Sequence, residues 1–428
     1  ELEAVRACKS SHLDADIFRW NDKYSKLKNY DAYILPGGFS YEDRGRSGII
    51  ASKDPIMEVI QKESEKGKPL LGICNGAQIL IECGLIPGFN KNRLEMALAG
   101  NERIKDNKIL GTGFYNDWVY IRSHYAPGRS VFNNFANHIV MRVPVAHCEG
   151  RFTTRQKEVL ESLVENEQAL FRYCDKNGKF TNAFPVNPNG ALYNLAGVCN
   201  PQGHILALMP HPERTPHGQP IFDSLKKYLE QGRKTHVEKM KIIKKPDLLE
   251  EKRDGRFQKP DLVILINLVI TDNEERTIEN TLLRLGYKDI ALKRQIYLGF
   301  YFEGSRSEET VKILAEKLIR SGEILNINKE IPTIFINNKT YLFDTQKGLI
   351  DNNNTIFSDS CYLAQEYDNY TGKSIQNRLV NHDGFDSIIK IERGVFWSIK
   401  TKNGAKVEKI IKSHIFHNPH SMKLVSLS

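Results

Sequence analysis

Residues 69–83 follow a pattern that fits a buried strand, a tight turn and a helix in immediate succession. Residues 69–73 form a short apolar run, residues 75–83 have a helix-forming composition, and Cys74 lies between them with glycines at positions 72 and 76. A turn this tight strains its central residue, and the glycines remove side chains that would clash. We therefore expect the Cys74 sulfur to stand above the edge of a sheet.

Other segments continue the alternation of strand and helix between residues 30 and 229. Residues 30–35 and 206–209 have the composition of strands, and residues 54–66 that of a helix in which Asp54 is the N-cap and Pro55 the first helical residue. This order predicts an α/β domain with a mostly parallel sheet.

The residues around Cys74 predict a nucleophile. The N-terminus of the following helix would stabilise a thiolate, and the Asn75 amide would donate to an oxyanion. His211 and Glu213 follow the strand at residues 206–209 and point the same way, so that Glu213 would orient His211 as the base for the thiol. Each feature also has an ordinary structural explanation, such as a buried cysteine or a surface histidine.

A glycine pair follows the strand at residues 30–35, in the sequence Pro36-Gly37-Gly38. Taken alone it is a turn, but a glycine pair also lets the backbone present an N–H group, which makes Gly38 a candidate oxyanion donor. Together, this pair, the G-x-C-x-G-x-Q motif around Cys74 and the H-x-E motif at His211 resemble the class I, triad-type glutamine amidotransferases.

Two further stretches narrow the resemblance. The sequence PGGFSY at residues 36–41 and the sequence PVAHCEGRF at residues 144–152 are similar to the glutaminase-subunit family of phosphoribosylformylglycinamidine synthase, and the likeness covers residues 1–230. It implies that Cys74 attacks the glutamine amide, His211 shuttles the proton and Glu213 orients His211. The remaining implied site residues are the oxyanion donors Gly38 and Asn75, Gln78 near the bound glutamine, and His147 and Glu149 in a loop near the site or the partner.

The resemblance also implies partners for the chain. Ammonia would pass to a separate large synthetase subunit, which uses ATP and magnesium to convert formylglycinamide ribonucleotide into its amidine in purine biosynthesis. The chain itself would hold no cofactor and no metal. Three alternatives remain open: a glutaminase for another acceptor, a cysteine peptidase of the same superfamily, or a non-catalytic assembly scaffold.

The sequence departs from the family pattern in three places. Glu42 and Cys148 stand where the family usually has glycine. The family also opens with a strand before the helix that corresponds to residues 1–7, so we expect the first strand to be missing and the sequence to be a truncated chain or a fragment.

The second half of the sequence has a different texture. Residues 231–260 contain ten Lys or Arg and five Asp or Glu, which predicts a charged linker. Beyond it, residues 262–270, 290–302 and 324–327 are expected to form strands, and residues 273–285 and 308–319 helices. This order recurs from residue 374, where SIQN matches TIEN at residue 277, and predicts α+β copies at 261–330 and 361–428 with an insert at 331–360.

Both copies, the second more clearly, resemble the small structural subunit family of the same synthase. The stretches GKSI at 372–375 and GF at 384–385 carry this likeness. It implies that the tail bridges the glutaminase and the synthetase, and that the two copies form an internal pseudo-dimer.

The remaining composition favours a cytoplasmic protein that binds neither nucleic acid nor membrane. Seven cysteines without CxxC spacing argue against a disulfide scaffold and a zinc site. Over half of the net charge of +9 lies in the predicted linker, and no apolar run reaches the roughly 18 residues of a membrane span. His414, His417 and His420 lack a neighbouring carboxylate or cysteine, so a metal site there is disfavoured.

Overall fold

The chain forms two units, residues 1–250 and residues 251–428. The computed structural model describes all residues except 137, 232–245, 247–258, 353–359, 402–404 and 428. The predicted linker at residues 231–260 therefore lies almost entirely outside the described residues. Within the part of the chain that is described, no helix is both long and apolar enough to cross a bilayer.

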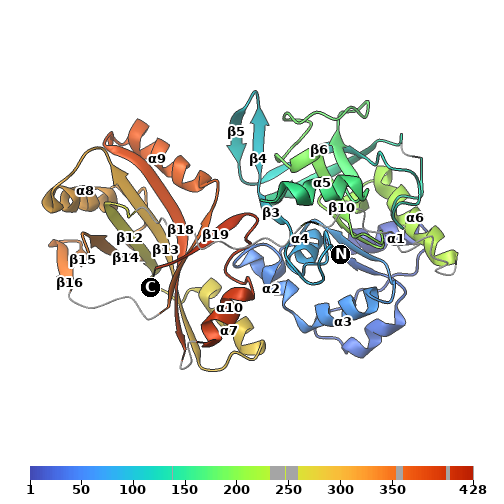
Figure 1. Cartoon of the computed structure of the whole chain (residues 1–428), viewed down its shortest axis with the longest axis horizontal. Coiled ribbons are helices and arrows are strands. Elements are labelled where there is room, and N and C mark those ends of the chain that lie inside the picture. The colour runs from blue at the N-terminus through green and yellow to red at the C-terminus, as the bar shows by residue number, and fades with distance from the viewer. Residues whose placement is uncertain (137, 232–245, 247–258, 353–359, 402–404, 428) are drawn as a thin grey trace. The chain divides into compact units, whose positions relative to one another are not determined.

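Short strands and helices alternate through the first unit, as the sequence predicts (Figure 1). Its helices are α1 (Leu2–Ser10), α2 (Ile49–Ser52), α3 (Pro55–Ser64), α4 (Asn75–Glu82), α5 (Lys157–Glu165) and α6 (Gln219–Glu230). Its strands are β1 (Tyr33–Leu35), β2 (Leu70–Ile73), β3 (Ala97–Gly100), β4 (Glu102–Lys105), β5 (Lys108–Thr112), β6 (Tyr115–Arg122), β7 (Met141–His147), β8 (Glu149–Thr153), β9 (Phe171–Cys174), β10 (Leu195–Cys199) and β11 (Ile205–Leu208).

Seven of these strands form one sheet in the order β1-β2-β11-β10-β9-β6-β7. The pairs β1–β2 and β2–β11 are parallel, whereas every other neighbouring pair is antiparallel. Because β10 and β6 alone run against the others, most strands share one direction although parallel pairing is confined to the part around β2. The α/β class is confirmed, and the parallel part carries Cys74 at its edge.

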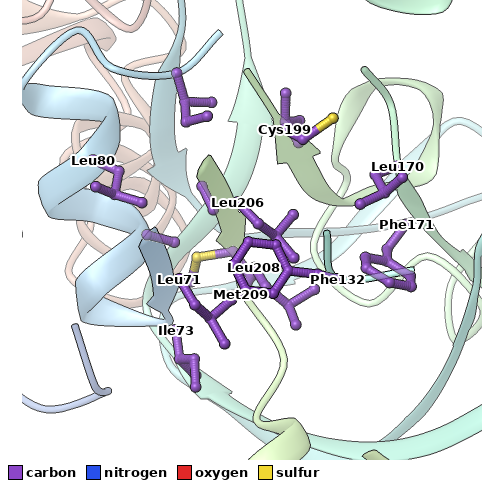
Figure 2. Close-up of a cluster of buried hydrophobic side chains, with 14 of the residues drawn as sticks. Leu71, Ile73, Leu80, Phe132, Leu170, Phe171, Cys199, Leu206, Leu208 and Met209 are labelled. Carbon is purple, nitrogen blue, oxygen red and sulfur yellow. The ribbon is translucent and has the colours of Figure 1, made fainter. Parts of the chain in front are cut away.

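Local sequence explains why the elements around the elbow begin and end where they do. The Asp54 side chain accepts a hydrogen bond from the Ile56 amide at 3.1 Å, and Pro55 occupies the first turn of α3, as predicted. All four residues of β2 and all eight of α4 are buried. Figure 2 shows the core beside them, to which β2, α4 and β11 contribute side chains together with Phe132 and Phe171.

The second unit consists of two copies of a β-α-β-α-β order. The first copy contains β12 (Leu262–Leu268), α7 (Asn273–Arg284), β13 (Ile290–Phe302), α8 (Glu308–Arg320) and β14 (Glu330–Ile336), followed by β15 (Lys339–Asp344) and β16 (Gly348–Asn352). The second copy contains β17 (Cys361–Glu366), α9 (Tyr370–His382), β18 (Ile388–Thr401), α10 (Ala405–Lys412) and β19 (Met422–Ser426).

One sheet joins the two copies in the order β16-β15-β14-β12-β13-β18-β17-β19. In each copy the first strand lies between the second and the third, and the two second strands, β13 and β18, pair antiparallel at the centre. Ile290 lies opposite Thr401 and Phe302 opposite Ile388, so the start of each strand faces the end of the other. The copies are therefore related by an approximate twofold axis through the β13–β18 pair.

Two details of the second unit differ from the sequence prediction. Residues 324–327 form no strand, and the third strand of the first copy is β14 instead. A turn and Asn326 occupy the predicted position, where the Asn326 amide donates to the Glu330 carboxylate at 2.7 Å. Hairpin strands do occur in the predicted insert, but β14 within it pairs with β12 along seven residues and so belongs to the copy.

Candidate active site

Cys74 lies in a strained turn between β2 and α4, as the sequence predicts. Its backbone adopts φ 50° and ψ −105°, a left-handed region that few residues other than glycine enter. A Cβ atom added at Gly76 would stand 2.0 Å from the Leu35 carbonyl oxygen. Glycine at this position therefore lets α4 approach β1 closely, and that approach holds Cys74 at the edge of the sheet.

The Cys74 thiol is buried in a polar corner of the fold. The side chain is 6% exposed, and Sγ donates to the Ala146 carbonyl oxygen at 3.7 Å. Burial raises the pKa of the thiol to about 12, a rise that the Asn75 N–H beside the sulfur opposes and the Glu213 charge adds to. The resting group is therefore the neutral thiol, and a nearby base must take its proton before it can attack a carbonyl carbon.

His211 and Glu213 form a buried pair next to this thiol. The imidazole Nδ1 and a Glu213 carboxylate oxygen are 2.7 Å apart, and their side chains are 2% and 5% exposed. Since the carboxylate accepts, Nδ1 carries the proton and Nε2 keeps the lone pair of a general base. The His211 amide donates to the Pro144 carbonyl at 2.9 Å, which fixes the loop to β7.

Gly37 lies where the side chains of His211 and Cys74 meet. A Cβ atom added at Gly37 would be 2.5 Å from His211 Cε1 and 3.4 Å from Cys74 Cβ, so both side chains meet above this glycine. Among the described residues no hydrogen bond joins the thiol to the imidazole, because the thiol points to Ala146. Such contacts are often long without substrate and tighten in the Michaelis complex.

The two predicted oxyanion donors flank the thiol from different elements. The Asn75 N–H opens α4 beside the sulfur. Gly38 follows β1, a Cβ atom added there would meet nothing within 4 Å, and its N–H makes no hydrogen bond to any described residue. The Ser40 amide donates to the Asn75 side-chain oxygen at 3.2 Å, which ties the glycine loop to the helix.

Gln78, one turn into α4, links this helix to β8 by a hydrogen bond. Its Nε2 donates to the Glu149 carbonyl at 2.7 Å, and its Oε1 accepts from Asn75 Nδ2 at 2.9 Å. Asn75 Nδ2 also reaches an Asp43 carboxylate oxygen at 3.3 Å. These bonds connect α4, β8 and the loop after β1 into one network around the elbow, and contact of Gln78 with glutamine stays a prediction.

Glu149 is the acidic end of that network. Its carboxylate accepts from the Ser47 amide at 3.2 Å. Burial raises its pKa to about 7 and the Asp43 charge adds to the rise, whereas the Ser47 hydrogen bonds and the Arg46 charge oppose it. Glu149 therefore titrates near neutral pH within reach of the nucleophile turn.

His147 is held in one tautomer by Asn101, a residue that the sequence analysis missed. Asn101 Nδ2 donates to the carbonyls of Gly113 and His147 at 3.0 and 2.7 Å, so its Oδ1 is the acceptor for the Gly150 amide and for His147 Nδ1, both at 3.1 Å. His147 Nε2 then carries a lone pair, and it is buried without a partner among the described residues.

Electrostatics keep His147 neutral. Burial first, and the proximity of His211 second, lower its pKa to about 3. No local signal marks Asn101, because its partners lie on β7 and β8, 46 and 49 positions further along the chain. The structure thus places His147 near His211, and the role of His147 stays a prediction.

The two departures from the family pattern lie on the rim of this arrangement. Glu42 adopts φ 58° between Tyr41 and Asp43, which are also left-handed, so it occupies a conformation that glycine adopts without strain. Cys148 is exposed between β7 and β8. Neither side chain intervenes between Cys74, His211 and Glu213.

In the described part of the chain no three His, Cys, Asp or Glu side chains are grouped so that they could hold an ion. His417 and His420 are buried, and the rings of His414 and His417 pack at 5.3 Å between centroids. These histidines are thus part of the packing of the second unit.

Comparison with known proteins agrees with this geometry. Residues 1–241 match the model of the CobB/CobQ-like glutamine amidotransferase domain. The PurQ subunit of phosphoribosylformylglycinamidine synthase from Methanothrix thermoacetophila is 42% identical over 250 residues, 54% of this chain and 93% of the relative. The Aquifex aeolicus PurQ subunit is 40% identical over 202 residues, 47% of this chain and 79% of the relative.

A solved structure gives a further comparison. One chain in the structure of PurLQS from Thermotoga maritima is 31% identical, with a TM-score of 0.41, and the match covers 53% of this chain and 92% of that one. The family match and the curated relatives, each over about half of this chain and most of the relative, decide the assignment. The chain belongs to the CobB/CobQ-like glutamine amidotransferase family and, within it, to the PurQ subunits of phosphoribosylformylglycinamidine synthase.

Proposed function

We propose that this chain is the glutaminase component of phosphoribosylformylglycinamidine synthase and hydrolyses glutamine to glutamate and ammonia. The observation that carries the proposal is the buried His211–Glu213 pair, 2.7 Å apart, which meets Cys74 above Gly37. This is a nucleophile, a base and an orienting carboxylate in the arrangement that amide hydrolysis requires.

The first half of the reaction forms a thioester. His211 Nε2 takes the thiol proton while Cys74 Sγ attacks the side-chain amide carbon of glutamine, and the amides of Asn75 and Gly38 stabilise the oxyanion. The imidazolium then gives its proton to the amide nitrogen, the carbon–nitrogen bond breaks and ammonia leaves. Glu213 stabilises the imidazolium throughout and holds Nε2 toward the thiol.

Water completes the cycle. His211 takes a proton from a water molecule as its oxygen attacks the thioester carbon, and the collapse of the second tetrahedral intermediate releases glutamate. The proton returns to Cys74 Sγ. His147, whose free Nε2 lone pair lies near His211, offers an acceptor for a departing N–H group without itself becoming charged.

Ammonia released here is consumed, in our proposal, by the large synthetase subunit during ATP-dependent amidation of formylglycinamide ribonucleotide. The relatives from Methanothrix thermoacetophila and Aquifex aeolicus are each named as a subunit of phosphoribosylformylglycinamidine synthase, which supports a partner subunit that uses the ammonia. ATP and magnesium would act on the synthetase. Seven cysteines without CxxC spacing fit a reducing, cytoplasmic compartment.

For the second unit we propose an assembly role, as a duplicated counterpart of the small structural subunit. Two β-α-β-α-β copies joined in one sheet by an approximate twofold axis support this proposal, because such a pair presents similar surfaces in two directions. Bridging of the glutaminase and the synthetase is the activity it would serve.

The test measures ammonia and glutamate formed from glutamine, with and without the synthetase, ATP and formylglycinamide ribonucleotide. Cys74→Ala should abolish glutamate formation, whereas Cys8→Ala, which removes a buried cysteine of α1, should leave it intact. Turnover that survives Cys74→Ala would refute the mechanism. Ammonia that is released but never incorporated into the ribonucleotide would favour a glutaminase for another acceptor.

A further inference from the structure

Two arginines face each other across neighbouring strands, at the end of β6 that lies away from His147. Arg122 at the end of β6 is the direct cross-strand partner of Arg172 in β9. The opposite end of β6, at Tyr115, pairs with His147 beside the catalytic residues. Seven residues of strand separate the two ends by about 24 Å, so Arg122 lies at the other end of β6 from the His147 pairing.

Like charges directly opposite each other destabilise a sheet, and aromatic rings offset only part of that cost here. The Arg172 guanidinium lies 3.9 Å from the Phe180 ring centroid and 3.5 Å from that of Tyr193. The Arg122 guanidinium lies 4.6 Å from the same Phe180 ring. Arg172 Nε donates to the Tyr193 carbonyl at 2.8 Å, which fixes the plane of the group.

No carboxylate of the residues that the structure describes neutralises the pair. Among the described residues neither guanidinium forms an ion pair, and Arg122 Nε is buried without a hydrogen-bond partner. Asp175 lies close by, but its Oδ1 accepts from the amides of Asn177 and Lys179. Three other well-packed arginines, by contrast, each contact a carboxylate: Arg46 with Glu82, Arg151 with Glu102, and Arg294 with Asp272.

A histidine, His124, lies against the same Phe180 ring as the two arginines. His124 lies two residues beyond Arg122, its ring is 5.7 Å from that of Phe180, and its Nδ1 is buried without a partner among the described residues. Burial lowers the pKa of His124, and the charges of Arg172 and Arg122 lower it further. The positive charge of the arginine pair therefore disfavours the protonated form of His124.

We propose that Arg122, Arg172 and His124 form a binding site for an oxyanion, the phosphate group of a phosphomonoester or free phosphate. A guanidinium fixed between two rings keeps its outer N–H edge in a defined plane, which is the geometry that phosphate oxygens match. The anion neutralises the Arg–Arg repulsion and occupies the unpaired donor of Arg122. A chloride ion would supply the charge but no set of oxygens for the planar donor edge.

The experiment titrates the full chain with sodium phosphate and, separately, with glycerol 3-phosphate, against sodium chloride at equal ionic strength. Binding is followed by calorimetry and by the shift in melting temperature. Arg122→Gln removes one guanidinium while keeping a side chain of similar length. Arg142→Gln is the matched control, because Arg142 also stacks on an aromatic ring, 4.7 Å from the Trp118 centroid, on the adjoining strand β7.

We expect saturable binding in the wild type and in Arg142→Gln, and at least about tenfold weaker binding in Arg122→Gln, the loss expected for one charge-assisted contact. Tighter binding of glycerol 3-phosphate would identify a monoester as the ligand, and equal or weaker binding would identify free phosphate. Absence of saturable binding by either anion, or equal affinity in Arg122→Gln and wild type, would overturn the proposal.

A second readout does not depend on affinity. Bound phosphate offsets the repulsion that the arginines exert on the His124 imidazolium, so the pKa of His124 measured by nuclear magnetic resonance should rise when phosphate saturates the chain. His124→Gln assigns the resonance. An unchanged His124 pKa at saturating phosphate would place the bound anion elsewhere and refute the site.

Discussion

The proton on Cys74 sets the chemical problem that the neighbouring residues must solve. With a pKa raised to about 12 by burial, the thiol cannot supply a standing thiolate near neutral pH. In the proposed mechanism its reactivity depends on His211, whose Nδ1 is held by Glu213. Because that mechanism uses the three residues as a unit, single replacements should have large effects on the rate.

Glu213→Gln tests this dependence. The amide matches the carboxylate in shape but is neutral and can donate to Nδ1, which would place the imidazole proton on Nε2 and remove the base. We expect kcat for glutamine hydrolysis to fall by about 10²-fold or more with a smaller change in KM. Glu58→Gln, an exposed site in α3, is the control. A kcat within twofold of the wild type would contradict the role of Glu213.

Glu149 gives the first unit a pH dependence of stability. Its pKa in the folded chain is about 7, above the ordinary value of 4.5, because burial disfavours the carboxylate. Its stabilising contribution is therefore complete below pH 4.5 and is lost as the pH rises through 7. The free energy of unfolding should fall by roughly 3 kcal/mol over that range from this group alone.

Glu149→Gln removes that titration, since the amide stays neutral. Urea unfolding of wild type and variant at intervals from pH 5 to pH 8 should show midpoints that diverge, with the variant gaining relative stability as the pH rises. Glu58→Gln serves again as the comparison, because its side chain is exposed. Two midpoint curves that run parallel over this range would show that Glu149 keeps an ordinary pKa.

At the scale of elements, the sequence predicted what local patterns determine. The boundaries of α3, α4 and β13 follow from capping residues, glycines and apolar runs, and the structure agrees closely with them. The antiparallel pairing of β10, β9, β6 and β7 was not predicted, because partners are chosen by contacts between segments far apart in the chain. For the same reason Asn101 escaped notice although it fixes His147.

The packing of α4 on β1 is the element-scale feature that supports the site. An added Cβ at Gly76 would come within 2.0 Å of the Leu35 carbonyl oxygen, so Gly76→Ala must push α4 away from the sheet. We expect a loss of roughly 2 kcal/mol or more in stability and a parallel loss of glutaminase activity. Gly100→Ala, where an added Cβ meets nothing within 4 Å, should change the melting temperature little.

Equal melting temperatures for the two alanine variants would show that α4 can shift without cost. A variant at Gly76 that keeps its stability but loses activity would instead separate the position of Cys74 from the packing of the helix. Far-ultraviolet circular dichroism of both proteins distinguishes these results from simple unfolding.

At the scale of the whole molecule, two independent units share one chain, and the second is itself double. The repeat was visible in the sequence because the order of its elements recurs, even though few letters are shared. The way in which the copies pair could not be predicted, because nothing in the sequences of β13 and β18 indicates which strand each will pair with. The two strands are thirteen and fourteen residues long, and each covers an edge of the other that would otherwise be exposed.

The twofold relation predicts that the first copy alone should pair with itself. A chain of residues 259–352 would expose β13 as an edge, and the β13–β18 register, which pairs Ile296 with Val395 and Tyr297 with Gly394, can be reproduced by two β13 strands centred between these residues. Light scattering should report a dimer for this fragment and a monomer for residues 259–427. A monomeric short fragment would show that the two copies are not interchangeable.

Joining the copies in one polypeptide fixes a ratio that separate genes must otherwise regulate. Every chain contains one amidotransferase unit and two sheet copies. Dilution cannot separate the two copies, because they pair within one polypeptide. The two copies can also diverge in sequence, because each has its own stretch of the polypeptide. The β15–β16 hairpin extends the sheet beyond the first copy only, so the two copies present different surfaces. A symmetric pair that diverges in this way can bind two different partner surfaces.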